Sequence, residues 1–372
     1  HLRFPEFSGE WKMCTIGELT TKVGSGVTPR GGEAVYKTEG HPFVRSQNVG
    51  LGNLLLDDIA FIDEETHLRQ KSTELQFNDV LLNITGASIG RSALVDKQIV
   101  GGNVNQHVCI IRTKENLVPS FICSFLLSNY GQRQIDSFQA GGNRQGLNFE
   151  QIKSIKITIP SKDEQIKIAK LLRAIDERIA TQNKIIDKLQ SLIKGLRVCC
   201  MQRNGSDNVY LSEIAQIYQP QTISSAELTE DGFLVYGANG IIGKYKDYNH
   251  KTEQICITCR GNTCGMVNYT KPMSWITGNA MVINTDKYQD KVYKKYLYHY
   301  LSAYNFNSII SGSGQPQIVR TPLEKLKITL PTISEQKQKA MILDKIQDKI
   351  DINHNVLNLY ILQKQYLLRQ MF

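Results

Sequence analysis

Apolar residues recur at alternating steps of three and four in two long stretches of the chain. The first stretch runs from Leu172 to Leu196, and the second, at a constant offset, runs from Leu343 to Leu367. This spacing places the apolar side chains on one face of a helix and is typical of a coiled-coil seam. The sequence therefore predicts two long helices that pair along these seams.

The residues that precede the two seams repeat as well. Ile155-Lys-Ile-Thr-Ile-Pro160 recurs as Leu326-Lys-Ile-Thr-Leu-Pro331, and the same Glu-Gln pair follows each proline, at 164–165 and at 335–336. Each copy predicts a short strand, a stop at the proline and the start of a helix. Weaker matches lie further upstream: Ile16-Gly-Glu-Leu19 with Leu211-Ser-Glu-Ile214, Gly86-Ala-Ser-Ile-Gly90 with Gly261-Asn-Thr-Cys-Gly265, and Gly102-Asn103 with Gly278-Asn279.

A repeat of this length dictates the architecture, because each copy is one structural unit. We predict an α+β fold class, with two mixed α/β domains, duplicated, that are joined by two long antiparallel coiled-coil helices. The expected domains span residues 1–159 and 204–330. The expected helical segments span 160–203 and 331–372, with the first helix running from about residue 163 to 199.

Three polar residues interrupt the seams. Gln182 and Asn353 occupy equivalent steps, and a buried amide in a seam costs stability but penalises slipped registers. We predict that these two amides set the helix register by forming a polar layer; the alternative is that both face solvent. Lys364 stands where the first seam has Ile193, and its stem can pack while its charge reaches water.

The composition changes this picture only modestly. The formal net charge is +9, from 44 basic and 35 acidic residues, which favours a polyanionic partner without requiring one. No apolar run approaches the roughly 18 residues that a membrane-spanning helix needs. The first residues lack the apolar core of a signal peptide, so a cytoplasmic location is expected. The start at His1 indicates that a few native residues are missing.

The chain shows no complete metal or catalytic motif. Its eight cysteines do not form a disulfide framework, and Cys256-x-x-Cys259 lacks a second ligand pair at zinc spacing. The stretch from Gly237 to Tyr245 resembles a phosphate-binding loop. It has five residues between its outer glycines instead of four, and a tyrosine where serine or threonine should bind magnesium. Hydrolase, metalloprotease and dinucleotide-binding signatures are missing too. We therefore expect no catalytic residue, no metal and no bound cofactor.

The turns of both domains are instead rich in side chains that read base edges. Arginine pairs with guanine, asparagine and glutamine pair with adenine, and serine or threonine with either base, although each residue taken singly is also a common turn former. In the first domain the candidate DNA contacts are Arg30, Arg45, Gln47, Asn48, Thr85, Ser88, Arg91, Asn105, Gln106, Asn143, Arg144 and Gln145. In the second domain they are Tyr236, Asn239, Lys244, Arg260, Asn262, Thr263, Asn279, Gln315 and Gln317.

The two copies share framework glycines but differ in the side chains on their turns. Thr85 stands opposite Arg260, and Ala87 stands opposite Asn262. One scaffold thus presents two sets of donors and acceptors. If the chain reads DNA, its site is bipartite and asymmetric, unlike the palindrome of a homodimer.

Together these residues resemble one family, the specificity subunits of type I restriction-modification enzymes. The resemblance covers essentially the whole chain. It rests on the duplicated order of domain and helix, the two strand-proline-Glu-Gln approaches, and the turn Thr85-Gly-Ala-Ser-Ile-Gly90. Further support comes from Tyr236-Gly-Ala-Asn-Gly-Ile-Ile-Gly-Lys244, Arg260-Gly-Asn-Thr-Cys-Gly265, the opening Leu2-Arg-Phe-Pro-Glu-Phe and Trp11.

The resemblance implies a division of labour. Each domain is a target-recognition domain that reads half of a split site in double-stranded DNA, and the helices act as a ruler for the unread spacer. Two modification subunits methylate adenine with S-adenosylmethionine, and restriction subunits cleave with ATP and magnesium, so none of these cofactors is expected on this chain. The helix flanks and the tail from Tyr366 to Phe372 are candidate docking surfaces, with ordinary packing as an equal alternative.

Two other functions compete with this interpretation. The chain could be the recognition subunit of a different bipartite DNA modification system. It could also be a coiled-coil scaffold whose domains bind protein rather than DNA. The scaffold predicts little salt dependence with DNA, whereas binding dominated by phosphate contacts weakens steeply as salt rises.

Overall fold

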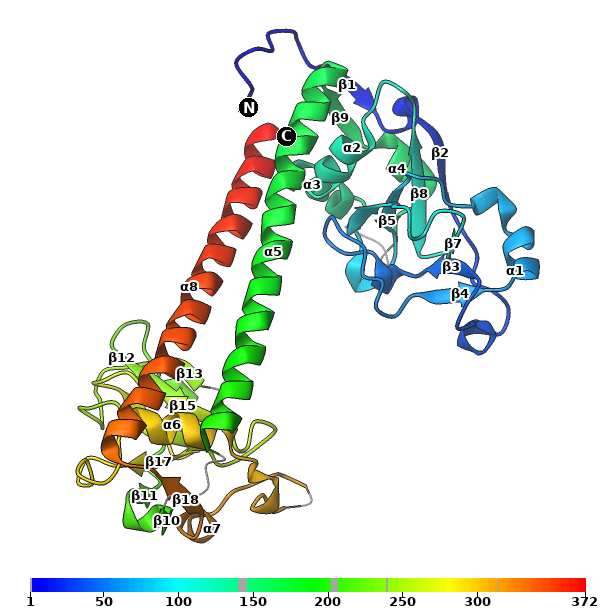
Figure 1. The fold of residues 1–372 in the computed structure, drawn as a ribbon. Helices are drawn as coiled ribbons and strands as arrows, with labels where there is room; N and C mark the ends of the chain where they lie inside the picture. Colours follow the sequence, from blue (N-terminus) through cyan, green and yellow to red (C-terminus); the bar gives the residue numbers. More distant parts are fainter. Residues whose placement is uncertain (1, 140–145, 202–206, 239, 313) are drawn as a thin grey trace. The chain divides into compact units, whose positions relative to one another are not determined.

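The computed structural model describes residues 2–139, 146–201, 207–238, 240–312 and 314–372. It divides into two compact units (Figure 1): unit 1 comprises residues 1–183 and 355–372, and unit 2 comprises residues 184–354. Each unit holds one mixed domain together with one half of each long helix. The duplicated α+β fold that the sequence predicts is confirmed.

The domain of unit 1 is built on three small sheets. A four-stranded antiparallel sheet has the order β2 (Thr20–Ser25), β8 (Val108–Thr113), β5 (Val80–Asn83), β6 (Ser92–Leu94). A three-stranded sheet has the order β4 (Ala60–Ile62), β3 (His41–Val44), β7 (Asn103–Val104), with β3 and β7 parallel. A two-stranded sheet pairs β1 (Lys12–Thr15) with β9 (Lys156–Ile159). The α-helices of this domain are α1 (Glu64–Arg69), α2 (Pro119–Leu126), α3 (Asn129–Ser137) and α4 (Phe149–Ser154).

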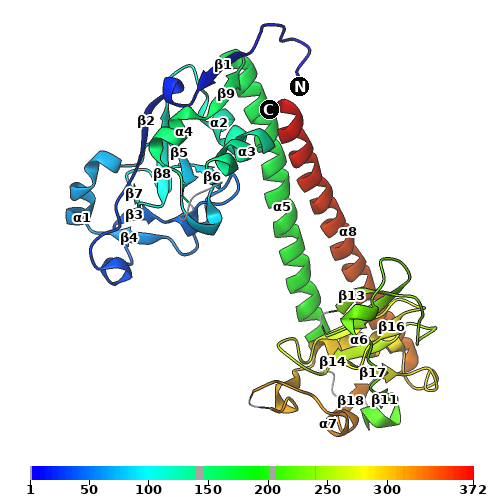
Figure 2. The same cartoon turned by 180° about the vertical axis from the view of Figure 1, so that it is seen from behind.

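The domain of unit 2 repeats this topology strand for strand. Figure 2 shows the chain from behind, with several strands of this domain labelled, among them β13, β14, β16 and β17. Its four-stranded sheet has the order β11 (Gln216–Tyr218), β17 (Ala280–Asn284), β14 (Ile255–Thr258), β15 (Val267–Tyr269). Its three-stranded sheet has the order β13 (Gly240–Tyr245), β12 (Phe233–Gly237), β16 (Trp275–Ile276), with β12 and β16 parallel. Its two-stranded sheet pairs β10 (Asp207–Tyr210) with β18 (Lys327–Leu330), and its α-helices are α6 (Lys294–Ala303) and α7 (Arg320–Glu324).

One of the predicted sequence matches is wrong. Asn103 lies in β7 and pairs with Phe43 of β3, whereas the equivalent position of β16 is occupied by Trp275, which pairs with Val235. The structural counterpart of Asn279 is His107, because the carbonyl oxygens of both accept an amide from the end of the central strand, at 3.0 Å. A match of only two residues, Gly-Asn, is too short to fix an alignment across loops of different length.

The long helices are α5 (Lys162–Met201) and α8 (Ile333–Met371), and they pair antiparallel within each unit. In unit 2 the last turns of α5 pack on the first half of α8 through the predicted seam, which consists of Leu189, Ile193, Leu196, Leu343, Ile346 and Ile350. In unit 1 the start of α5 packs near the end of α8. There Lys364 replaces an apolar residue and places its Nζ 2.5 Å from Oδ1 of Asp176. The lapse in the seam is thus a charge pair.

The predicted register amides lie in different units. Gln182 is buried on α5 in unit 1. Asn353 is half-buried on α8 in unit 2, where its side-chain Nδ2 donates 2.6 Å to the carbonyl oxygen of Lys349 in its own helix. A polar layer formed by the two amides stays a prediction.

The C-terminal tail belongs to the core of unit 1. Leu367, Leu368 and Met371 are buried with the apolar residues of α2, and the ring of Phe372 lies 5.0 Å from the ring of Phe121. The amide of Leu2 donates 2.7 Å to the carbonyl oxygen of Gln370, so both chain termini lie at the same end of the helix pair in this unit (Figure 1). Of the two accounts of the tail, packing explains these side chains.

A polar relay centred on the buried His299 connects three helices in unit 2. Arg197 Nε of α5 donates to Nδ1 of His299 at 3.2 Å, and Nε2 of His299 donates to Oδ1 of Asp344 on α8 at 3.0 Å. Lys295 Nζ of α6 lies 2.8 Å from the other oxygen of Asp344. Because its Nδ1 accepts a hydrogen bond, His299 is neutral in this arrangement. Burial lowers the pKa of His299 below its ordinary value of 6.5.

This relay makes the stability of unit 2 depend on pH. Since the folded pKa of His299 is lowered, its contribution is complete above pH 6.5 and is lost as the pH falls through the folded pKa. We expect the urea midpoint of unit 2, followed by Trp275 fluorescence, to fall on acidification, and His299→Gln to flatten that dependence. His354→Gln, at an exposed position of α8, is the control. Equal slopes for His299→Gln and the wild type would contradict the assignment.

Candidate nucleic-acid interface

Each domain carries a glycine turn after its central strand. In unit 1 the turn from Gly86 to Gly90 follows β5, and in unit 2 the turn from Gly261 to Gly265 follows β14. The φ angles of these glycines are 72° and 85° in the first turn and 86° and 93° in the second. These left-handed angles are adopted readily only by glycine. The backbone of the two turns is therefore built in the same way.

A polar side chain at the end of the central strand ties each turn to the neighbouring sheet. In unit 1, Nδ2 of Asn83 donates to the carbonyl oxygen of Ser46 at 2.8 Å and to Oγ of Ser88 at 3.1 Å. In unit 2, the hydroxyls of Thr258 and Thr263 both donate to the carbonyl oxygen of Ala238, at 2.6 and 2.9 Å. These bonds hold the glycine turn against the residues that follow β3 or β12.

A third segment, the loop before α4 or α7, lies along the same turn. In unit 1, Leu147 donates its amide to the carbonyl oxygen of Ile84 at 2.9 Å, and in unit 2, Ile318 donates to that of Cys259 at 3.0 Å. Isolated bridges, Thr85 with Gly146 and Arg260 with Gln317, extend both pairings. The predicted contacts Asn143, Arg144, Gln145 and Asn239 lie outside the described residues.

In unit 2 this arrangement gathers several of the predicted DNA contacts. Arg260, Asn262, Asn279, Gln315 and Gln317 are all exposed. Arg260 bridges Gln317, and the carbonyl oxygen of Asn279 accepts the amide of Cys259 next to Arg260. One surface of the domain therefore displays guanidinium and amide groups, which can recognise the edges of guanine and adenine.

Two other predicted contacts of unit 2, Tyr236 and Thr263, take part in holding the fold together. Tyr236 is 5% exposed, packs with Cys256 and Ile276, and its hydroxyl accepts the amide of Lys271 at 3.0 Å. Burial raises the pKa of this tyrosine. Such a side chain has almost no surface to offer to a base, so its prediction as a DNA contact is corrected. Thr263 holds the turn as described above. The side chain of Lys244 is 42% exposed, with its Nζ 3.3 Å from Oδ1 of Asp231, and its role as a DNA contact stays a prediction.

In unit 1 the segment after β3 folds onto itself. Asn48 is fully buried and donates 2.9 Å to both Leu55 O and Asp58 Oδ1, so its prediction as a base reader is corrected in the same way. Arg45 donates 2.6 Å to the carbonyl oxygen of Asp58, and its guanidinium carbon lies 5.4 Å from the ring centre of Tyr36. The side chain of Gln47 also donates to the carboxylate of Asp58.

The remaining predicted contacts of unit 1 that the structure describes differ in their accessibility. The hydroxyl of Thr85 lies 2.6 Å from Nδ1 of His107, and Oδ1 of the buried Asn105 accepts the amide of His107 at 3.0 Å. The side chain of Gln106 accepts the amide of Thr28 at 3.0 Å. Ser88 is half-buried in the turn, while Arg30 and Arg91 are exposed. Whether the accessible residues contact bases stays a prediction.

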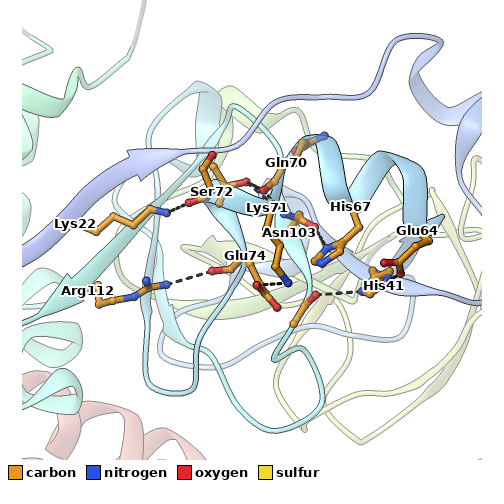
Figure 3. Close-up of polar contacts among 12 residues, drawn as sticks. Lys22, His41, Glu64, His67, Gln70, Lys71, Ser72, Glu74, Asn103 and Arg112 are labelled. Carbon is orange, nitrogen blue, oxygen red and sulfur yellow. Dashed lines mark hydrogen bonds and ion pairs between the residues drawn. The ribbon is translucent and has the colours of Figure 1, made fainter.

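A polar network that the sequence analysis missed joins His41, Glu64, His67, Asn103 and Gln70 (Figure 3). His41 and His67 stack with ring centres 3.8 Å apart, and Nε2 of His41 lies 2.6 Å from Oε2 of Glu64. The hydrogen bond with His41 lowers the pKa of Glu64. Nδ1 of His67 lies 2.7 Å from Oδ1 of Asn103, whose Nδ2 donates 3.0 Å to the carbonyl oxygen of Gln70.

The network reaches the loop with Arg30 through Gln70, because Oε1 of Gln70 accepts the amide of Val27 at 3.4 Å. Its members come from β3, α1 and β7, which lie far apart in the sequence. No local pattern connects such residues, so only the folded chain identifies them. Among the described residues, no group of three or more histidine, cysteine, aspartate or glutamate side chains is placed to hold a metal ion. Likewise, no described helix is long and apolar enough to cross a membrane.

Comparison with known proteins connects this geometry to a family. The family model for the type I restriction modification DNA specificity domain matches the sequence at residues 8–191 and 204–359, with one match per repeat. The putative type I restriction enzyme MjaX specificity subunit of Methanocaldococcus jannaschii is 22% identical over 387 residues, which cover 93% of this chain and 89% of that protein.

Two solved structures share the fold. The type I restriction-modification S subunit from M. genitalium superposes with a TM-score of 0.68 at 16% identity, covering 99% of this chain and 98% of that one. A chain from a structural study of complex assembly and conformational transition in the type I system superposes with a TM-score of 0.59 at 16% identity, covering 98% and 97%. The duplicated domains, the two paired helices and the family match over both repeats show that the chain belongs to the type I restriction-modification DNA specificity family, as a specificity subunit.

Proposed function

We propose that this chain reads a split, asymmetric site in double-stranded DNA, with one half-site bound by each recognition domain. The observation that carries the proposal is the pair of glycine turns, which share backbone angles and anchoring hydrogen bonds but display different side chains. Thr85 and Ala87 in unit 1 stand where unit 2 has Arg260 and Asn262. Two turns with the same backbone but different hydrogen-bond donors and acceptors are suited to reading two different base sequences.

The chain itself takes no catalytic step in this proposal. Two modification subunits, with S-adenosylmethionine, methylate adenine in the bound site, and restriction subunits use ATP and magnesium. The exposed apolar residues of the long helices support docking of these partner subunits on this chain. On α5 these are Ile185, Leu192 and Val198; on α8 they are Met341, Ile342 and Ile352 in unit 2 and Leu359, Ile361 and Leu362 in unit 1. Exposed apolar side chains at helical spacing suit partner helices.

Single-molecule sequencing of adenine methylation tests this function. The chain is expressed with and without an active modification subunit, and genomic DNA is read after each expression. We expect a split, asymmetric motif that is methylated only when both proteins are present. No new methylation from a verified complex would favour the protein-binding scaffold instead, and DNA binding with little salt dependence would support the same conclusion.

Arg260 offers a specific test of the second half-site. Arg260→Ala is expected to reduce methylation of the wild-type motif by about 5- to 150-fold, because a bidentate contact to a base contributes about 1–3 kcal/mol of discrimination. The preference should relax at one position of one half-site and stay unchanged in the other half-site. Lys287→Ala is the matched control, since Lys287 is exposed beyond the opposite end of β17 from Asn279. Equal losses for both variants would show that Arg260 contributes charge rather than base recognition.

A further inference from the structure

The glutamine in the first turn of α5 joins three backbone segments of unit 1. Gln165 is 1% exposed. Its Oε1 accepts the amide of Val118 at 2.9 Å, while its Nε2 donates to the carbonyl oxygens of Asn116 and Pro160, both at 3.1 Å. Val118 is the residue that caps the start of α2. One side chain therefore connects the long helix to the strand before it and to a core helix of the recognition domain.

Unit 2 contains the same joint. Gln336 of α8 is also 1% exposed, and its Oε1 accepts the amide of Tyr293, which caps α6, at 2.8 Å. Its Nε2 donates to the carbonyl oxygens of Lys291 at 3.1 Å and Pro331 at 2.9 Å. Every bond of the Gln165 side chain thus has its counterpart.

The neighbouring glutamates do not share a common role. Glu164 is buried and forms two hydrogen bonds of 2.8 Å with the guanidinium of Arg3. Glu335 instead accepts the amide and hydroxyl of Thr332 at 3.1 and 2.9 Å. In the repeated Glu-Gln pair, the glutamine side chain therefore forms the same set of hydrogen bonds in both copies.

The geometry of this joint restricts rotation of the domain on its helix. The chain between β9 and α5 consists of Pro160 and Ser161 alone, and a connection of two residues can act as a hinge. The bonds from Gln165 to Asn116 and Val118 form an attachment away from the hinge, in addition to the apolar packing of α5 against the domain core. Hydrogen bonds are directional, and a buried amide that loses its partners is costly, so the pair of attachments resists bending.

We propose that Gln165 and Gln336 are positioning residues that fix the orientation of each recognition domain on its long helix, and thereby restrict the spacer between the half-sites. The effect on the spacer rests on the proposed function, whereas the effect on domain orientation does not. A DNA site with one base pair too many shifts and rotates one half-site relative to the other. A stiff joint makes that mismatch costly, whereas a loose joint lets the domain follow the DNA.

The first test measures the joint without DNA. Spin labels are introduced as unnatural amino acids at Lys97 of the domain and Arg173 of α5, which are both exposed in unit 1. Gln165→Met keeps the length of the side chain but removes its hydrogen bonds, and it is expected to broaden the distance distribution between the labels. Gln190→Met, at an exposed glutamine of α5, should leave the distribution unchanged. An unchanged distribution in folded Gln165→Met would overturn the proposal.

The second test measures the spacer. Complexes with the modification subunit methylate DNA carrying both half-sites separated by the wild-type spacer or by one base pair more or fewer. For Gln165→Met and Gln336→Met we expect the preference for the wild-type spacer to fall about tenfold, equivalent to about 1.4 kcal/mol, with half-site sequences unchanged. A broadened label distance with an unchanged spacer preference would overturn the role in spacer selection.

A second variant guards against misfolding. Gln165→Glu keeps the shape and the acceptor for Val118 but loses the donor to Asn116 and Pro160, and we expect it to show the same changes to a smaller degree. If the methionine variant does not fold, the glutamate variant decides both tests. The wild-type complex separates the two proposals, because its failure to methylate any split motif would refute the proposed function while the label distances still test the joint.

Discussion

Removal of the last six residues, Leu367 to Phe372, is expected to lower the free energy of unfolding of unit 1 by about 4–8 kcal/mol, because burying each large apolar side chain contributes about 1.5–3 kcal/mol. Leu367, Leu368 and Met371 are buried, and the ring of Phe372 lies 5.0 Å from Phe121 and 5.9 Å from Phe125. The truncation also removes the acceptor of the Leu2 amide. Such a loss approaches the whole stability of a typical domain.

The two tryptophans make this prediction measurable. The ring centre of Trp11 lies 6.4 Å from that of Phe121, so Trp11 reports on the region that the tail covers. In a Trp275→Phe background, urea unfolding followed by Trp11 fluorescence should shift to a much lower midpoint after truncation. Leu362→Ala, at a residue of α8 that is 59% exposed, is the control. If the truncated chain and the control unfold at the same midpoint, the tail does not belong to the core.

Replacement of Arg112 by methionine is expected to destabilise unit 1 by about 2–4 kcal/mol, because it leaves a buried carboxylate without its partner. The guanidinium donates to both carboxylate oxygens of Asp79 at 2.7 Å, and the Asp79 side chain is 1% exposed. A third hydrogen bond, 3.2 Å long, joins Arg112 to the carbonyl oxygen of Glu74 (Figure 3). The hydrogen bonds with Asp79 raise the pKa of Arg112, so the guanidinium is charged at neutral pH.

A second substitution separates the cost of the stranded charge from the loss of packing. Asp79→Asn removes the charge but keeps an oxygen for the amide of Gln76, which Asp79 accepts at 2.8 Å. The double variant Asp79→Asn/Arg112→Met should therefore unfold at a higher urea concentration than Arg112→Met alone, although both variants lose the ion pair. Equal midpoints would mean that the carboxylate is not stranded and that the expected cost has another origin.

The packing of the C-terminal tail and the Arg112–Asp79 ion pair stabilise the fold of the recognition domain. The proposed DNA recognition depends instead on exposed side chains that this fold positions. Asn83 in unit 1 and Thr258 in unit 2 are different residues that anchor the glycine turn to the same place. The exposed turn residues are free to differ because they contribute little to this anchoring. Duplication of one stable frame can therefore yield two specificities.

The sequence by itself determined the features that depend on local pattern. The seam spacing predicted both long helices, and the proline after each repeated strand predicted where β9 and β18 end and where α5 and α8 begin. The glycines at both ends of each turn indicated a framework shared by the two copies, and all four have the left-handed angles that favour this residue type. These features arise from interactions between neighbours along the chain, so a pattern of residues records them.

The tertiary structure alone decided which of the predicted contacts are accessible. Asn48 and Tyr236 were predicted as DNA contacts, yet both are buried in the folded chain. Asn48 donates to Leu55 and Asp58, and Tyr236 packs with Cys256 and accepts the amide of Lys271. The match of Asn103 with Asn279 failed for a related reason, because strand pairing rather than local identity aligns the two copies. In the sequence, the polar joint at Gln165 was likewise visible only as a glutamine that recurs at position 336. Burial and pairing depend on residues brought together from distant parts of the chain, and no local spacing encodes those partners.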